Sequence, residues 1–165
     1  MENIKNKKVC GWLELDSEEK SKLFNFNDSY LEFLNSVKTE REANKYIIKE
    51  LTNNGFVNVN NLDKLNVGDK VYYDNRGKSV FAAVIGKNNL EEGINLIGAH
   101  IDSPRLDLKP NPLYQDSKLA LLKTHYYGGI KKYQWTTIPL ALHGVIVKKI
   151  LEKLLINIGE DDNDP

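Results

Sequence analysis

The chain has 165 residues, of which 41% are hydrophobic and 28% charged, proportions that are ordinary for a globular protein. They exclude collagen, a coiled coil and wholesale disorder. The 23 Lys and Arg residues balance 23 Asp and Glu residues, so overall charge does not favour nucleic-acid binding. Cys10 is the only cysteine, which excludes an internal disulfide framework and fits a reducing compartment.

Two features bear on where the protein acts. The N-terminal residues Met1–Lys5 lack the apolar run of a signal peptide. No stretch of the sequence approaches the roughly 18 apolar residues that cross a membrane. We therefore expect a cytoplasmic protein that has neither a membrane nor a nucleic acid as its partner.

The first third of the chain is expected to be mainly helical. Residues 1–26 are predicted to be an irregular or short helical lead, and apolar residues at a spacing of three and four predict a helix over residues 27–37. A stronger signal starts at Thr39, because Thr39 and Glu42 form the pattern of a capping box. The helix that follows is expected to end at Gly55, since glycine readily takes the left-handed conformation.

Strand-forming sequence comes next. Residues 56–59 predict a short strand, and residues 71–74 and 79–85 predict a hairpin around a glycine-containing turn. Residues 94–100 are a compact apolar run and are predicted to be a buried strand. A helix followed by strands favours an α/β or α+β architecture.

The second half of the chain is expected to contain more β-structure. Residues 104–118 include three prolines and predict a connection near which a domain boundary could lie. Residues 119–127 and 136–147 are strand-like, and residues 151–158 form a further apolar element.

The candidate for chemistry is a His-x-Asp pattern at the end of the predicted buried strand, formed by His100 and Asp102. Neutral imidazole is a good zinc or cobalt ligand, and a nearby carboxylate can accept its other N–H. Taken alone the pattern is weak, because a histidine at a strand end is more often structural and a catalytic metal needs at least three protein ligands. His125 and His143 have no metal-type spacing around them, and a structural or surface role is expected for both.

A family resemblance adds to this pattern. The segment Gly98–Pro112 resembles the first metal motif of the M18 family of metalloaminopeptidases, the aspartyl aminopeptidase family. Residues 73–79 are similar to the hairpin that precedes this motif, residues 124–130 to the glycine-rich segment after it, and residues 158–165 to a loop of the second domain. Residues 131–139 differ from the Trp-Phe-Asp-Arg-like continuation of aspartyl members and point to a bacterial subgroup.

The resemblance implies a fold and a division of the chain. The fold is α/β, a zinc-peptidase-type catalytic domain that is present in part, followed by the start of an inserted β-rich dimerisation domain. Residues 1–103 would be the N-terminal part of the catalytic domain, and residues 104–165 the first, incomplete part of the inserted domain. We therefore expect the first third or so of a longer enzyme, which assembles as a homo-oligomer from a dimer to a dodecamer.

The resemblance also implies a chemistry. His100 would be the first metal ligand and Asp102 the catalytic carboxylate beside it. Two zinc ions per complete site, with cobalt or manganese as alternatives, would activate a water that removes N-terminal residues from peptide substrates. The other ligands, the Glu general base and a His from a neighbouring subunit would lie beyond Pro165, so the fragment alone is expected to be inactive.

Two other hypotheses stay open. If the 165 residues are the whole protein, it would be a non-catalytic assembly or binding module that keeps half of the family's architecture. The His-x-Asp pattern could also belong to a related di-metal peptidase or deacylase family, which the order of the downstream ligands would distinguish.

Overall fold

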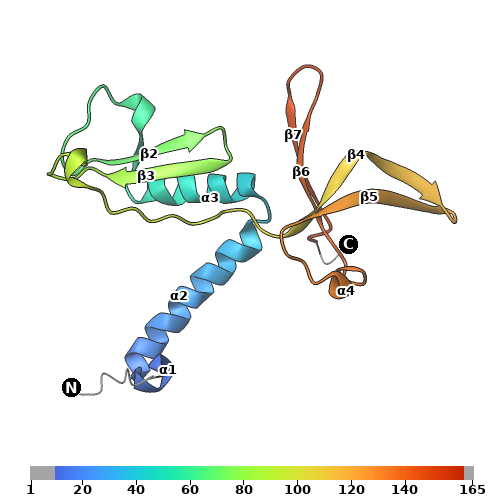
Figure 1. The fold of residues 1–165 in the computed structure, drawn as a ribbon, viewed down its shortest axis with the longest axis horizontal. Helices are drawn as coiled ribbons and strands as arrows, with labels where there is room; N and C mark the ends of the chain where they lie inside the picture. The colour runs from blue at the N-terminus through green and yellow to red at the C-terminus, as the bar shows by residue number, and fades with distance from the viewer. Residues whose placement is uncertain (1–9, 162–165) are drawn as a thin grey trace, which may run out of the picture. The chain divides into compact units, whose positions relative to one another are not determined.

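The computed structural model describes residues 10–161 of the chain and divides into two units, residues 1–36 and 37–165, which are described separately. In the first unit, α1 (Gly11–Glu14) precedes α2 (Ser17–Ser36) (Figure 1). Helix α2 begins ten residues before the predicted helix, because Asp16 and Glu19 cap it reciprocally. The Asp16 carboxylate accepts from the Glu19 N–H at 2.8 Å, and the Glu19 carboxylate accepts from the Asp16 N–H at 3.0 Å.

The predicted lead over residues 1–26 is therefore helical in much of its described part, and residues 1–9 lie outside the described residues. The rings of Trp12 and Phe24 meet edge to face at 5.9 Å, which holds α1 against α2. Among residues 10–161, no helix is both long and apolar enough to cross a membrane.

The second unit opens with α3 (Glu40–Asn53), where the predicted capping box is confirmed. The Thr39 hydroxyl accepts from the Glu42 N–H at 3.3 Å, and the Glu42 carboxylate accepts from the Thr39 N–H at 2.9 Å. The helix ends as predicted before Gly55, which has a φ of 81°.

Helix α3 lies along a three-stranded sheet of β1 (Val57–Asn58), β2 (Lys70–Asn75) and β3 (Ser79–Val84) (Figure 1). Strand β1 is parallel to β2 and is followed by the 3-10 turn η1 (Val59–Asn61). The β2–β3 pair is the predicted antiparallel hairpin.

The contact between α3 and the hairpin is partly polar. Ala43 and Asn44 of α3 are buried, with 1% and 2% of their surface exposed, as is Val71 of β2. The Asn44 side-chain amide donates to Asp74 Oδ1 at 3.0 Å. The same oxygen accepts from the Gly77 N–H at 2.8 Å, so one carboxylate holds both the helix and the hairpin turn.

Residues 104–118 were expected to form a connection, and this prediction is wrong. They contain β4 (Arg105–Asp116), which pairs with the predicted strand β5 (Leu119–Tyr127). The prolines are tolerated because the ladder is interrupted there: residues 109–112, which include Pro110 and Pro112, face Lys123 alone.

A third hairpin follows the short helix α4 (Lys132–Trp135). It pairs β6 (Leu142–Val147) with β7 (Lys153–Ile158). The predicted strand over residues 136–147 is thus confirmed only in its second half, and the apolar element over 151–158 becomes β7 after a turn.

The buried strand predicted over residues 94–100 is also absent from the described structure. After the 3-10 turn η2 (Leu90–Glu92), the chain stays irregular up to Pro104. Leu96 and Ile97 are 82% and 96% exposed. A strand needs hydrogen-bonded neighbours, and within residues 10–161 no other segment pairs with this one.

Candidate metal site around His100

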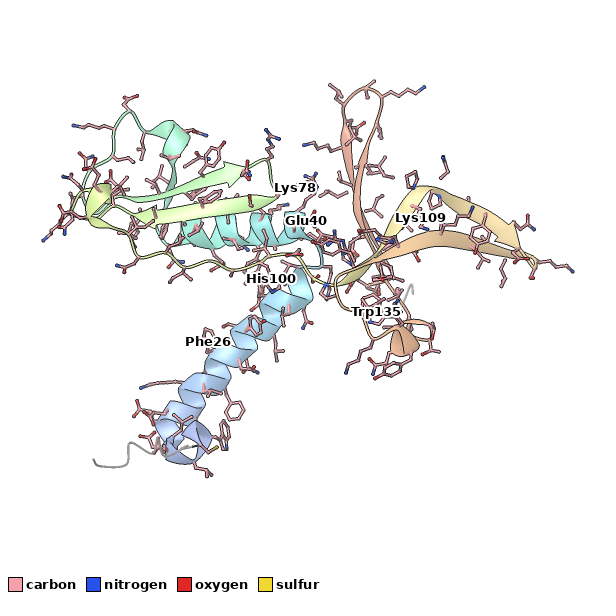
Figure 2. All side chains as sticks on the ribbon, viewed as in Figure 1. Phe26, Glu40, Lys78, His100, Lys109 and Trp135 are labelled. Atoms are coloured by element: carbon pink, nitrogen blue, oxygen red, sulfur yellow. The ribbon has the colours of Figure 1, made fainter. Side chains whose placement is uncertain are left out.

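The His100 imidazole lies on the irregular segment that leads into β4 (Figure 2), and its side chain is 84% exposed. Its Nδ1 lies 2.9 Å from the carbonyl oxygen of Asp102. A carbonyl oxygen can only accept, so in the neutral ring Nδ1 carries the proton and Nε2 carries the lone pair. The local backbone therefore sets the tautomer in which Nε2 can bind a metal ion.

The Asp102 carboxylate lies beside the same ring. Its Oδ1 is 3.5 Å from His100 Nδ1, which is farther than the Asp102 carbonyl oxygen. Its Oδ2 accepts a hydrogen bond from the Tyr127 hydroxyl at 2.8 Å. That hydrogen bond is the main reason why the pKa of Asp102 lies below its usual value, with a further contribution from the residue's own N–H.

Tyr127 and Arg105 support Asp102 from the base of the β4–β5 hairpin, where they are directly opposite each other. The Arg105 guanidinium lies 4.1 Å from the centre of the Tyr127 ring. Arg105 Nε donates to Asp107 Oδ1 at 2.7 Å, and its NH1 lies 3.9 Å from a Glu40 carboxylate oxygen. The hydrogen bond to the Asp102 carboxylate raises the pKa of Tyr127, so this hydroxyl keeps its proton.

Sequence reasoning missed Tyr127 and Arg105. Their proximity depends on the register of β4 and β5, in a segment that the prolines made look like a connection. Asp102 is predicted from the sequence because it lies two residues after His100, and its role stays a prediction.

His143 belongs to a second cluster, formed with Glu42 and Glu160. Its Nδ1 lies 2.9 Å from Glu42 Oε1 and its Nε2 lies 3.0 Å from Glu160 Oε1. Burial of this ring, 10% exposed, would lower the pKa of His143, but hydrogen bonds to the two carboxylates outweigh it and raise the pKa. The pKa of Glu42 lies below its usual value. Partial burial alone would raise this pKa, but the hydrogen bonds with His143, Lys38 and Thr39 outweigh the effect of burial.

The remaining histidine, His125, stands opposite Asp107 in the β4–β5 ladder, and its ring stacks on that of Tyr126 at 5.4 Å. Residues 10–161 contain no group of three His, Cys, Asp or Glu side chains placed to hold a metal ion. His100 fits zinc as a single nitrogen ligand, because its ring is exposed and its Nε2 has the lone pair.

Comparison with known proteins identifies the family. The family model described as aminopeptidase I zinc metalloprotease (M18) matches residues 33–165. A protein of Borrelia garinii named probable M18 family aminopeptidase 1 is 50% identical over 159 residues, covering 96% of this chain and 35% of its own length.

Solved structures agree. The crystal structure of aminopeptidase I from Borrelia burgdorferi matches with a TM-score of 0.89 and 48% identity, covering 93% of this chain and 38% of that one. The M18-family aminopeptidase of Thermotoga maritima matches with a TM-score of 0.87 and 43% identity, over 98% and 35% of the two chains. The chain thus spans about a third of the length of the curated relatives and solved structures it matches.

Proposed function

The chain belongs to the M18 family of zinc metalloproteases, and we propose that it forms the N-terminal portion of an aminopeptidase that removes N-terminal residues from peptides. One observation carries the proposal: the family match includes the His100 motif, and Nδ1 of His100 faces the Asp102 carbonyl oxygen at 2.9 Å, which leaves the Nε2 lone pair for an ion. The name of the Borrelia garinii relative supports the same activity.

In this proposal His100 is a ligand and Asp102 positions it. The Asp102 carbonyl accepts the Nδ1 proton, and its carboxylate places a negative charge 3.5 Å from the ring, which makes Nε2 a stronger donor. A bound zinc ion would supply Lewis acidity that lowers the pKa of a water and polarises the scissile carbonyl.

The other ligands and the general base are proposed to come from outside residues 10–161. A catalytic zinc takes three protein ligands, and His100 supplies one. The chain covers about 35% of the length of the Borrelia garinii relative, so the greater part of such an enzyme has no counterpart in this sequence. A site of two ions follows from the family resemblance.

We further propose that residues 1–103 belong to the catalytic domain and that residues 104–165 begin an inserted dimerisation domain. In support, within residues 10–161 β4 pairs with β5 and β6 pairs with β7, and none of these four strands joins the β1–β2–β3 sheet. A homo-oligomer in the cytoplasm is the corresponding proposal for assembly and location, the latter supported by the single cysteine.

The test is an aminopeptidase assay on the complete protein of which this chain is proposed to be the N-terminal portion. We expect the complete protein to release N-terminal residues from peptides. A chelator should abolish this release, and added Zn²⁺ should restore it. His100→Ala should remove activity by a factor of at least about 100, in line with losing a direct metal ligand. His125→Ala is the matched control. Its activity should stay close to that of wild type, because the His125 ring stacks on Tyr126 and has no metal role in this proposal.

Two results would contradict the proposal. One is a complete protein that is inert on aminoacyl substrates with every divalent metal tried, which would favour the non-catalytic assembly module. The other is full activity in the His100→Ala variant, which would remove His100 from the metal site.

A further inference from the structure

We propose that Tyr127 is a positioning residue for the metal ligand, holding the Asp102 carboxylate, and through it the His100 imidazole, in the orientation that binds the ion. The inference rests on the proposed function, since it needs His100 to be a ligand. It adds a residue from the end of β5, which lies 25 positions after Asp102 in the chain.

The hydrogen bond itself is well suited to this role. The Tyr127 hydroxyl donates to Asp102 Oδ2 at 2.8 Å, an ordinary distance for a hydroxyl donor, and a charged acceptor makes the hydrogen bond stronger than a neutral one. Because Oδ2 is fixed, the other oxygen, Oδ1, is turned toward His100 Nδ1 at 3.5 Å. Without the hydroxyl, the half-buried Asp102 side chain could rotate away from the ring.

Tyr127 is in turn held by Arg105. Arg105 pairs with it across the ladder and covers its ring at 4.1 Å. Arg105 is itself held by Asp107 at 2.7 Å and approached by Glu40 from the first turn of α3 at 3.9 Å. The network therefore ties the start of α3, the base of the hairpin and the His100 segment together.

The backbone after Tyr127 adds a close contact. Gly128 has a φ of 73°, and a Cβ built on it would lie 3.4 Å from Pro104 Cα. The end of β5 thus runs against the segment that carries His100 and Asp102, which brings the Tyr127 hydroxyl within reach of the Asp102 carboxylate.

The effect of removing the hydroxyl can be bounded. Losing an outer hydrogen-bond partner of a metal ligand typically weakens metal affinity by about 10- to 100-fold. Tyr127 acts one residue further out and is 41% exposed, so we expect a smaller loss, about three- to tenfold.

The chain offers a matched control. Tyr127→Phe removes only the hydroxyl and keeps the ring under Arg105. Tyr126→Phe makes the same change one residue earlier, where the ring stacks on His125 and lies 4.3 Å from Lys132 Nζ.

The experiment measures the Zn²⁺ dissociation constant of the complete protein by competition with a chromophoric chelator. We expect Tyr127→Phe to raise it about three- to tenfold and Tyr126→Phe to leave it unchanged. In a His100→Ala background, Tyr127→Phe should have no further effect, because the two changes act on one ligand.

The proposal is overturned if Tyr127→Phe binds Zn²⁺ as tightly as wild type, or if it weakens binding equally in the His100→Ala background. A wild-type protein that does not bind Zn²⁺ would instead refute the proposed function. Should Tyr127→Phe fold less well, the visible spectrum of the folded Co²⁺-loaded protein decides. Bands shifted from wild type, with those of Tyr126→Phe unshifted, support positioning, and bands identical to wild type refute it.

Discussion

The His143 cluster allows a local stability effect to be worked out in advance. Replacing His143 by Gln keeps hydrogen-bonding capacity but removes the charge that faces Glu42 at 2.9 Å and Glu160 at 3.0 Å. Hydrogen bonds to charged groups contribute about 1.5–3 kcal/mol when buried, and exposed ion pairs about 0.2–1 kcal/mol. The ring is 10% exposed, but the carboxylates of Glu42 and Glu160 are 34% and 39% exposed. The energies of these two contacts are therefore taken close to those of exposed ion pairs.

We take about 1 kcal/mol for the Glu42 contact and about 0.5 kcal/mol for the more exposed Glu160 contact. The free energy needed to open the β6–β7 hairpin should then be about 1.5 kcal/mol lower in the variant. This difference corresponds to about tenfold faster amide exchange. His125→Gln is the matched control, and it should leave exchange in residues 142–158 unchanged.

The pH dependence follows from the direction of each pKa shift. The pKa of His143 is raised in the folded state, so its contribution is complete below about pH 6.5 and is lost as the pH rises through the folded pKa. The pKa of Glu42 is lowered, so its contribution is present above about pH 4.3 and is lost only as the pH falls through the folded pKa. Both contributions are therefore complete between about pH 5 and pH 6.

Hydrogen exchange read by mass spectrometry, with times corrected for the intrinsic rate, compares the amide exchange rates of the β6–β7 hairpin in the variant and in wild type. We expect exchange to be about tenfold faster in the variant at pH 6, and the difference to be smaller at pH 9. An equal ratio at both pH values, or no difference at pH 6, would refute the assignment of His143 as the charged link between α3 and the β6–β7 hairpin.

Three further predictions concern the second unit. Thr39→Ala should lower the free energy of unfolding of α3 by about 1 kcal/mol, measured as faster amide exchange in its first turn, and unchanged exchange there would argue against the capping box. Asn44→Asp would place a second carboxylate about 3 Å from Asp74 in a buried site, and thermal denaturation should show a loss of about 3 kcal/mol or more. The isolated chain should aggregate, because apolar residues such as Ile97 are 96% exposed, and a monodisperse monomer in light scattering would contradict this.

Local signals were the ones that sequence reasoning used well. The capping box at Thr39, the glycine after α3 and the β2–β3 hairpin all depend on residues within a few positions of each other, and all three are confirmed. The cap formed by Asp16 and Glu19 is equally local, but the prediction of an irregular or short helical lead over residues 1–26 does not include it.

Long-range pairing explains what was missed. The prolines of β4 argued against a strand, and only the bulge opposite Lys123 shows how the ladder absorbs them. The hydrogen bond between His143 and Glu42 joins residues 101 positions apart, and no spacing in the sequence indicates it. The apolar run over residues 94–100 has the composition of a strand, but strand formation depends on neighbours that residues 10–161 do not supply.

The candidate site follows the same division. His100 and Asp102 are predicted from positions two residues apart, and their roles stay predictions. The Tyr127 hydroxyl and the Arg105 guanidinium came only from the structure, because β-strand register brings them to Asp102.

The most direct test of the central claim is anomalous diffraction at the zinc edge from crystals of the complete protein. We predict a zinc peak about 2.0–2.1 Å from His100 Nε2, with Nδ1 still facing the carbonyl oxygen of Asp102. Zinc held only by other residues, or bound through Nδ1, would contradict it.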